Sequence, residues 1–320
     1  MLIKSADDRQ GDIEALTSLL ARPDLYDSTR QKIEQEIRTI RAGINGEREA
    51  AYHIDSHYGD STRSVILHDL RIEVEGRAAQ IDHLLITRFL DAWVFESKHF
   101  AEGVGVNEQS EWVAYWKGRP YGIASPIEQN RNHIAILKKA FDRGIVELPK
   151  RLRVRLKPQM HSIILVSSGA RISRPKSRAA QARVDGLDSV IKVDQLATII
   201  DKKIEETSTL SSIGAVARVV GMDTLEDVGR QLVALHKPIQ IDWAARFGLS
   251  STSTVPPSAV QPPAVQPPVS AASPIAGRSC ASCGSLVSPK VAAYCAANAE
   301  RFGGRTLCFD CQRRSTDPTA

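Results

Sequence analysis

Gln80-Ile-Asp-His-Leu-Leu-Ile86 and Ala92-Trp-Val-Phe-Glu-Ser-Lys-His99 are two hydrophobic runs, each about the length of one β-strand. Both are rich in β-branched and aromatic residues, and the polar turn Thr87-Arg88 lies between them. This pattern predicts two adjacent strands that pair as a hairpin. Charged residues interrupt both runs, because Asp82 lies inside the first and Glu96 and Lys98 end the second.

The alternation of side chains along a strand predicts where these charges point. Glu96 and Lys98 should share one face, with Ser97 on the other. Charges on paired hydrophobic strands are costly unless they are ion-paired, hydrogen-bonded or bound to metal. The two runs are therefore the best candidate for an active site. His83 should point to the face opposite Asp82, and we interpret it as structural.

The composition indicates a globular protein of about two domains. The chain has 320 residues, of which 42% are hydrophobic and 25% charged. No apolar run approaches the roughly 20 residues that a membrane span needs. The N-terminus is polar and acidic and does not resemble a signal peptide. We expect a cytoplasmic protein without a membrane partner.

Basic residues gather in the middle of the chain, although the net charge is only +5. The run from Lys150 to Lys157 alternates strictly, which predicts one strand with a basic face. Two interpretations stay open with equal weight. The face is either an edge strand protected from aggregation by charge, or a surface that contacts phosphates. The basic side chains of this face are Arg151, Arg153, Arg155 and Lys157.

Helical and strand patterns alternate over the rest of the first 248 residues. Residues 10–42 predict a helical hairpin, whose role is packing or contact with a partner protein or a second copy. Glu47 is expected near the start of the following helix, where the helix dipole alone explains an acid. Ser125-Pro126 with Glu128 forms a capping box that opens another helix.

Strands are expected at 64–75, 161–166 and 190–193, and a last helix over 222–247. Aromatic residues between 112 and 121 suggest further strands, with core packing favoured over base stacking. Together these elements predict an α/β domain with a mixed sheet.

A linker and a metal site are predicted at the C-terminal end. Residues 250–276 are rich in Pro, Ser, Ala and Val, which favours an extended polyproline conformation. Two Cys-x-x-Cys turns follow, 24 residues apart, and such turns complete a tetrahedral zinc site far more often than a redox pair. Arg305 near the second turn suits contact with nucleic acid, but zinc ribbons also serve as protein docking modules. Cys295 is left over, as a buried thiol or an alternative ligand. The expected Zn²⁺ ligands are Cys280, Cys283, Cys308 and Cys311.

The spacing of Asp82 and Glu96-x-Lys98 suits metal-assisted cleavage of a phosphodiester. Two carboxylates on adjoining strands hold Mg²⁺ or Mn²⁺ with several waters retained. The ion polarises the phosphate and acidifies a bound water, while a lysine orients that water or stabilises the developing charge.

Four ordered motifs now resemble the nuclease-related domain (NERD) family, which is grouped with the PD-(D/E)XK nuclease superfamily. They are Gly43-x-x-Gly46-Glu47, Gln80-Ile-Asp-His83, Glu96-x-Lys98 and Pro126-x-x-Gln129-Asn130. The resemblance covers roughly residues 40–140.

It implies a restriction-endonuclease-like mixed sheet flanked by helices, with Asp82, Glu96 and Lys98 as the catalytic signature. It also gives Glu47 and Gln129 roles in the site, which for Glu47 outweighs the dipole interpretation. Ser97 and His99 depart from the family pattern, and neither is expected to touch a proposed ligand. A ribbon similar to those of bacterial topoisomerases accompanies this domain in some relatives.

The expected organisation is an N-terminal helical region (1–42), a nuclease-like domain (43–248, core 43–140), a Pro-rich linker (249–278) and a zinc ribbon (279–314). The leading hypothesis is a Mg²⁺-dependent DNA endonuclease or DNA-processing enzyme whose ribbon binds nucleic acid. The alternative is a non-catalytic nucleic-acid-binding or docking protein that keeps the fold. An intact set of Asp82, Glu96 and Lys98 favours the enzyme.

Overall fold

The computed structural model describes residues 1–100, 102–151, 153–210, 219–249, 279–285, 287–308 and 311–312. The chain divides into two units, Met1–Gln240 and Ile241–Ala320. The predicted linker lies outside the described residues from 250 onward. None of the helices in the described ranges is long and apolar enough to cross a membrane.

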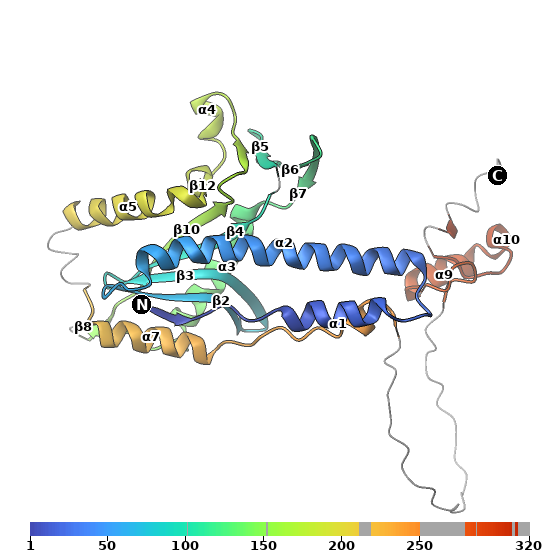
Figure 1. The fold of residues 1–320 in the computed structure, drawn as a ribbon, viewed down its shortest axis with the longest axis horizontal. Helices are drawn as coiled ribbons and strands as arrows, with labels where there is room; N and C mark the ends of the chain where they lie inside the picture. The colour runs from blue at the N-terminus through green and yellow to red at the C-terminus, as the bar shows by residue number, and fades with distance from the viewer. Residues whose placement is uncertain are drawn as a thin grey trace, which may run out of the picture. The chain divides into compact units, whose positions relative to one another are not determined.

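A six-stranded mixed sheet forms the centre of the first unit (Figure 1). Its order is β1-β2-β3-β4-β10-β12, with β2, β3 and β4 antiparallel and the other neighbours parallel. The strands span Leu2–Lys4 (β1), Ser64–Val74 (β2), Arg77–Thr87 (β3), Asp91–Lys98 (β4), Gln159–Val166 (β10) and Val190–Lys192 (β12). This arrangement confirms the predicted α/β class and the β3–β4 hairpin.

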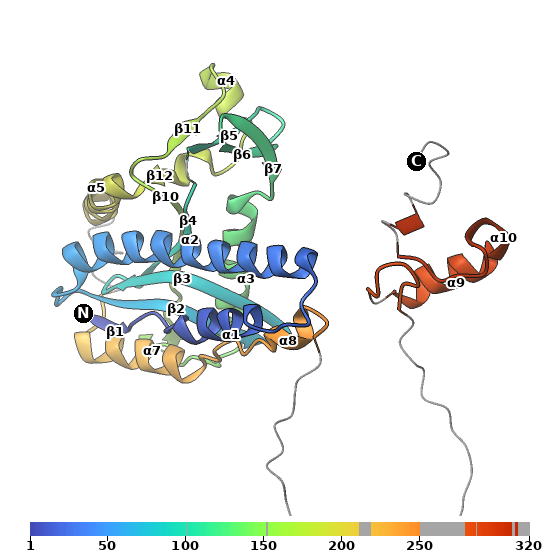
Figure 2. The ribbon, with the colours of Figure 1, turned by 45° about the vertical axis from the view of Figure 1, so that its right-hand side comes forward.

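Helices cover both faces of this sheet. α3 (Pro126–Asp142) and α7 (Met222–Ala234) pack on one face, where Ile136 and Val228 belong to one hydrophobic cluster with the strands. α2 (Asp27–Tyr58) and α5 (Leu196–Leu210) pack on the other through Ile54 and Ile200. Figure 1 shows the C-terminal half of α2 lying across the sheet and its N-terminal half extending beyond it beside α1, and Figure 2 shows the same helix from another side. Because β4 is covered on both sides, its residues from Asp91 to Glu96 are all buried.

A second sheet of four strands extends from the end of β4 (Figure 2). Its order is β11-β5-β6-β7, and the strands are Gly103–Val106 (β5), Trp112–Trp116 (β6), Arg119–Ile123 (β7) and Arg171–Ser173 (β11). Trp112 is 4% exposed and packs in the core, as predicted, whereas Trp116 is 58% exposed. A short helix, α4 (Arg178–Gln181), follows β11, and two 3₁₀ turns (Leu187–Ser189 and Val193–Gln195) flank β12.

The N-terminal helical hairpin is present, but its second helix is longer than predicted. α1 (Gln10–Leu20) is followed by α2, which runs without a break through both glycines of the 43–46 motif. The expected boundary between residues 42 and 43 therefore lies inside a helix.

The predicted basic strand over 150–157 is wrong. Two strands of two residues each, β8 (Lys150–Arg151) and β9 (Val154–Arg155), pair as a small antiparallel hairpin. Arg153 reverses the chain with φ of +68°. Val154 is 66% exposed, whereas Leu156 packs partly buried against the main core, so these two alternate residues do not share one buried face.

The predicted helix over 222–247 is also interrupted. α7 ends at Ala234, and a separate helix, α8 (Trp243–Arg246), follows. Pro238 explains the break, because a proline disfavours helical geometry at the residue before it.

Two short helices of the second unit, α9 (Pro289–Ala297) and α10 (Ala299–Phe302), lie between the two cysteine turns in the chain. Ser288 caps α9 by accepting a hydrogen bond from the amide of Val291. A small cluster that includes Val287, Ala292, Phe302 and Leu307 forms its hydrophobic core.

Candidate active site and metal centre

Asp82 lies where β3 and β4 diverge. The paired residues of the two strands run from Ile86 opposite Ala92 to His83 opposite Phe95. Asp82 is the next residue of β3 after this last pair. Its Oδ2 accepts hydrogen bonds from the amide of Ser97 at 2.7 Å and from the Ser97 hydroxyl at 2.8 Å. The expectation that Ser97 touches no proposed ligand is therefore wrong. That expectation assumed that side chains alternate ideally between the two faces of β4. The assumption fails because β3 and β4 separate at this point.

Glu96 and Lys98 point the same way, as predicted. Lys98 Nζ lies 2.7 Å from Glu96 Oε1, and His133 Nδ1 of α3 lies 3.3 Å from Glu96 Oε2. The second contact is not aligned as a hydrogen bond, and Glu96 Oε2 is left buried without a hydrogen-bond partner. A buried carboxylate oxygen in this state is costly unless a cation reaches it.

Glu47 reaches the site from the interior of α2. The next-door Gly46 packs on the chain just after β4, since a Cβ there would lie 2.7 Å from His99 Cβ. This close approach brings Glu47 toward the strand ends. The dipole interpretation of Glu47 is wrong, because α2 begins at Asp27, several turns earlier.

The carboxylates of the site are close enough to disfavour each other's ionisation. Burial raises the pKa of Asp82 well above its usual range, and the charges of Glu96 and Glu47 add to this effect. Burial likewise raises the pKa of Glu47 to about 7, with a further contribution from Asp69. A divalent cation would relieve this repulsion.

Sequence reasoning missed Asp69 of β2. The pairs His68–His83 and Leu70–Ile81 flank it, which places Asp69 opposite Asp82. Asp69 is 7% exposed, has φ of +50°, and accepts hydrogen bonds from Gln80 Nε2 at 2.9 Å and the amide of Asp7 at 3.2 Å. The signal was a shift of the apolar alternation by one residue. Val65 and Leu67 before Asp69 and Leu70, Ile72 and Val74 after it belong to the same hydrophobic cluster, although Val65-Ile66-Leu67 is apolar throughout and hides the shift in the sequence.

The Pro126-x-x-Gln129-Asn130 motif contributes structure through Asn130. The buried Asn130 Nδ2 donates to Val94 O at 2.8 Å and to Ser162 Oγ at 2.9 Å, which fastens α3 to β4 and β10. Gln129 is exposed and lies one helical turn before His133 on the same face of α3. A role for Gln129 stays a prediction.

His83 lies on the α2 side of the sheet, in a buried chain of polar side chains. His83 Nδ1 is 2.8 Å from His68 Nδ1, and His68 Nε2 is 3.0 Å from Asp55 Oδ1. Burial lowers the pKa of His83 well below its usual range, with a smaller effect of His68.

The carboxylates fit an open metal site. In the described part of the chain, the one group of three or more metal-ligand atoms within 4.8 Å of one another belongs to the cysteines. Asp82 and Glu96 thus do not form a closed cage with a third ligand. The buried Glu96 Oε2 and the neighbouring carboxylate of Asp82 are oxygen donors of the kind that Mg²⁺ takes, and this ion keeps several of its waters as further ligands.

The cysteines of the two turns converge as predicted. The Sγ atoms of Cys280, Cys283, Cys308 and Cys311 all lie within 4.8 Å of one another and could hold one metal ion. Gly284, with φ of +72°, allows the first turn to close. Cys295 is outside this set, 2% exposed, and its Sγ contacts the main chain of Leu307. It is a buried thiol of the small core.

The predicted nucleic-acid-binding residues of the first unit lie near the start of β10, at the opposite end of that strand from Lys98. β10 begins beside Asp91 and ends beside Lys98, so it extends for about 23 Å from Gln159, which follows the β8–β9 hairpin in the chain, to the level of Lys98. Arg151 donates to Val219 O at 2.6 Å, and Lys157 pairs with Asp142 at 2.8 Å. Arg305 is exposed in the second unit. Binding by these residues stays a prediction.

Residues 42–167 match the family model of the nuclease-related domain (NERD). The match begins within α2 and ends just after β10, so it contains Glu47, Asp82, Glu96, Lys98 and Gln129. No curated protein and no solved structure matches the chain.

Proposed function

Residues 42–167 are a nuclease-related domain, and from this premise we propose that the protein is a metal-dependent enzyme that hydrolyses phosphodiester bonds of DNA. The observation that carries the proposal is the buried Glu96, whose Oε1 pairs with Lys98 while its Oε2 has no hydrogen-bond partner. A protein that only bound nucleic acid would gain nothing from this costly arrangement.

Each residue of the site has a role in this proposal. Asp82 and Glu96 would hold Mg²⁺ or Mn²⁺, and the two hydrogen bonds from Ser97 fix the orientation of Asp82. When bound, the ion would polarise the scissile phosphate and acidify a water. The Lys98 ammonium, held by Glu96, would stabilise the charge that develops on the phosphoryl oxygens. Glu47 and Gln129 would complete the site from the two helices.

Several features support DNA as the substrate. The chain has a net charge of +5, and the β8–β9 hairpin with Lys157 concentrates basic side chains. Their distance from Lys98 suits contact with the backbone beyond the scissile bond. The cysteine cluster in the second unit would hold one Zn²⁺, and with Arg305 this ribbon would add a second contact with nucleic acid.

Cleavage assays with metal and site variants test the proposal. The full-length protein should cut supercoiled plasmid or linear single-stranded DNA with Mg²⁺ or Mn²⁺, and not with EDTA. Asp82→Asn and Lys98→Ala should each lower the rate at least ~100-fold, because both remove groups that act on the transition state. Lys202→Ala, which removes an exposed lysine of α5, is the matched control.

Two results would refute the proposed enzymatic activity. One is the absence of cleavage of any DNA under these conditions, and the other is full activity of both site variants. Binding of DNA without cleavage would support the alternative of a non-catalytic binding protein.

A further inference from the structure

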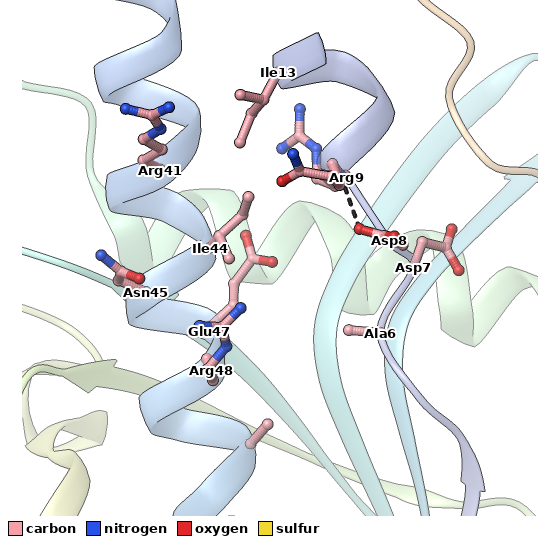
Figure 3. Close-up of a pocket in the computed structure, with 12 residues that line it drawn as sticks. Ala6, Asp7, Asp8, Arg9, Ile13, Arg41, Ile44, Asn45, Glu47 and Arg48 are labelled. Atoms are coloured by element: carbon pink, nitrogen blue, oxygen red, sulfur yellow. Dashed lines mark hydrogen bonds between the residues drawn. The ribbon is translucent and has the colours of Figure 1, made fainter.

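A hollow of about 510 Å³ lies beside the acidic site. Two segments form it, the stretch between β1 and the first turns of α1, and the middle of α2 (Figure 3). Its volume is within the range of sites that take small ligands or single nucleotide units. Residues 6–13 of one wall precede the part of the chain that matches the family model.

Glu47 connects the hollow to the catalytic carboxylates. Figure 3 shows its side chain extending from α2 toward the N-terminal segment, where Arg9 lies on the facing wall. Glu96 and Lys98 both act on the charge of Glu47, so they are close to its carboxylate. A group bound in the hollow would therefore lie next to the site of cleavage.

The α2 wall carries basic side chains without partners. Arg41, Asn45 and Arg48 follow one another along α2 at helical spacing (Figure 3). All three are exposed, and within the described residues neither arginine has a recorded ion pair or hydrogen bond. The two arginines are spaced roughly 10 Å apart along the helix axis.

The acids of the opposite wall are already engaged. Asp7 is paired with Lys4 at 2.7 Å and with His236 at 2.8 Å. Asp8 accepts a hydrogen bond from the amide of Gln10 at 2.8 Å. Arg9 is paired with Asp12 at 3.2 Å. Among the described residues, Arg41 and Arg48 therefore remain as the basic side chains of the hollow without an ion pair, beside two acids of its lining, Asp8 and Glu47, of which Glu47 has its pKa raised by burial to about 7.

We propose that this hollow is a subsite for the nucleotide next to the scissile bond, in which Arg41 and Arg48 bind phosphates of the substrate strand. This inference rests on the proposed action on nucleic acid. Guanidinium groups suit the ligand, because their planar set of donors matches phosphate oxygens. Asn45 lies between the two arginines and can donate to a sugar or base.

Salt-dependent binding without metal tests the subsite. The full-length protein in EDTA is titrated into a fluorescein-labelled single-stranded oligonucleotide at several salt concentrations, and anisotropy is measured. Arg41→Ser/Arg48→Ser should weaken binding about tenfold or more at low salt. Loss of two phosphate contacts should also reduce the slope of log K against log salt by about 1.4. Arg41→Lys/Arg48→Lys should keep the slope, because it keeps both charges.

Lys32→Ser/Lys202→Ser is the control for loss of two charges, since both lysines are exposed and outside the hollow. It should leave the slope within about 0.3 of the wild-type value. A wild-type slope and affinity for Arg41→Ser/Arg48→Ser, with an unchanged melting temperature, would overturn the subsite. That result is independent of cleavage, so it is distinguishable from failure of the proposed enzymatic function.

Discussion

Glu47 is a residue of the proposed active site whose partly buried carboxylate lowers the stability of the folded protein when it is ionised. Its pKa is raised to about 7 because burial removes water from the carboxylate. The unfolded chain ionises this group near 4.3 to 4.5. Between these values the folded state binds more protons than the unfolded state, so the contribution of Glu47 to stability falls as pH rises from about 4.5 to 7.

Glu47→Gln should therefore stabilise the metal-free protein at pH 8, by on the order of 2 kcal/mol, and flatten the pH dependence of stability. Urea unfolding in EDTA at pH 5, 6, 7 and 8 measures the effect. Glu34→Gln removes the same charge from α2 away from the site and is the control. Equal profiles for wild type and Glu47→Gln would contradict the prediction.

At this scale the sequence identified some residues and misplaced others. Asp82, Glu96 and Lys98 stood out because charges interrupted apolar runs, and the structure brings them together. Asp69 and the contact of Ser97 were missed, because both depend on local departures from regular strand geometry. The role of His133 as a neighbour of Glu96 depends on how α3 packs, which strand alternation does not predict.

Among the elements, α2 depends on one glycine for its position. A Cβ at Gly46 would meet His99 Cβ at 2.7 Å, whereas a Cβ at Gly43 has its nearest contact at 3.9 Å. Alanine is the better helix former by up to ~1 kcal/mol, so propensity alone favours both substitutions.

Gly43→Ala should raise stability by up to about 1 kcal/mol, while Gly46→Ala should lower it by about 1–3 kcal/mol. The second change must push α2 away from the end of β4, so cleavage should fall as well. Chemical denaturation of both variants measures the difference. Stabilisation of the same size in both would show that the contact with His99 is not tight.

Element types followed from the sequence more reliably than element ends. The hairpin of β3 and β4 and the cap of α3 were predictable, because turn chemistry, capping and apolar periodicity are local. The basic strand failed for the opposite reason. Its alternation was real, but a strand needs a neighbouring strand and a surface to cover, and neither can be read from residues 150–157 alone.

For the whole molecule, the four clustered cysteines of the second unit predict that each chain binds zinc. The full-length protein should contain about one zinc per chain by elemental analysis, because four thiolates within 4.8 Å form a tetrahedral site. Cys308→Ser should lose the zinc. Cys295→Ala removes a thiol outside the cluster and should keep it. Retention of zinc in Cys308→Ser, or its loss in Cys295→Ala alone, would reject this ligand set.

The basic residues of the β8–β9 hairpin predict how binding of the protein to a long DNA duplex depends on salt. Replacing Arg151, Arg153 and Arg155 by Ser should reduce the salt slope of binding to a long duplex by up to about 2.7, because three phosphate contacts are lost. Cleavage of a short oligonucleotide should change little, since the hairpin precedes the start of β10 and Lys98 lies beside its end, about 23 Å along this strand. An unchanged slope on the long duplex would assign the β8–β9 hairpin a purely structural role.

The unbroken course of α2 from Asp27 to Tyr58 has a mechanical consequence. At 1.5 Å per residue this helix is a stiff rod about 48 Å long, and Glu47 lies beyond its midpoint. A rod transmits rotation along its length. A partner that docked on the α1–α2 hairpin and tilted the first turns of α2 would load the close contact of Gly46 with His99, directly beside the Glu47 carboxylate. The N-terminal helices are thus stiffly connected to the part of α2 that carries Glu47 and packs on the sheet.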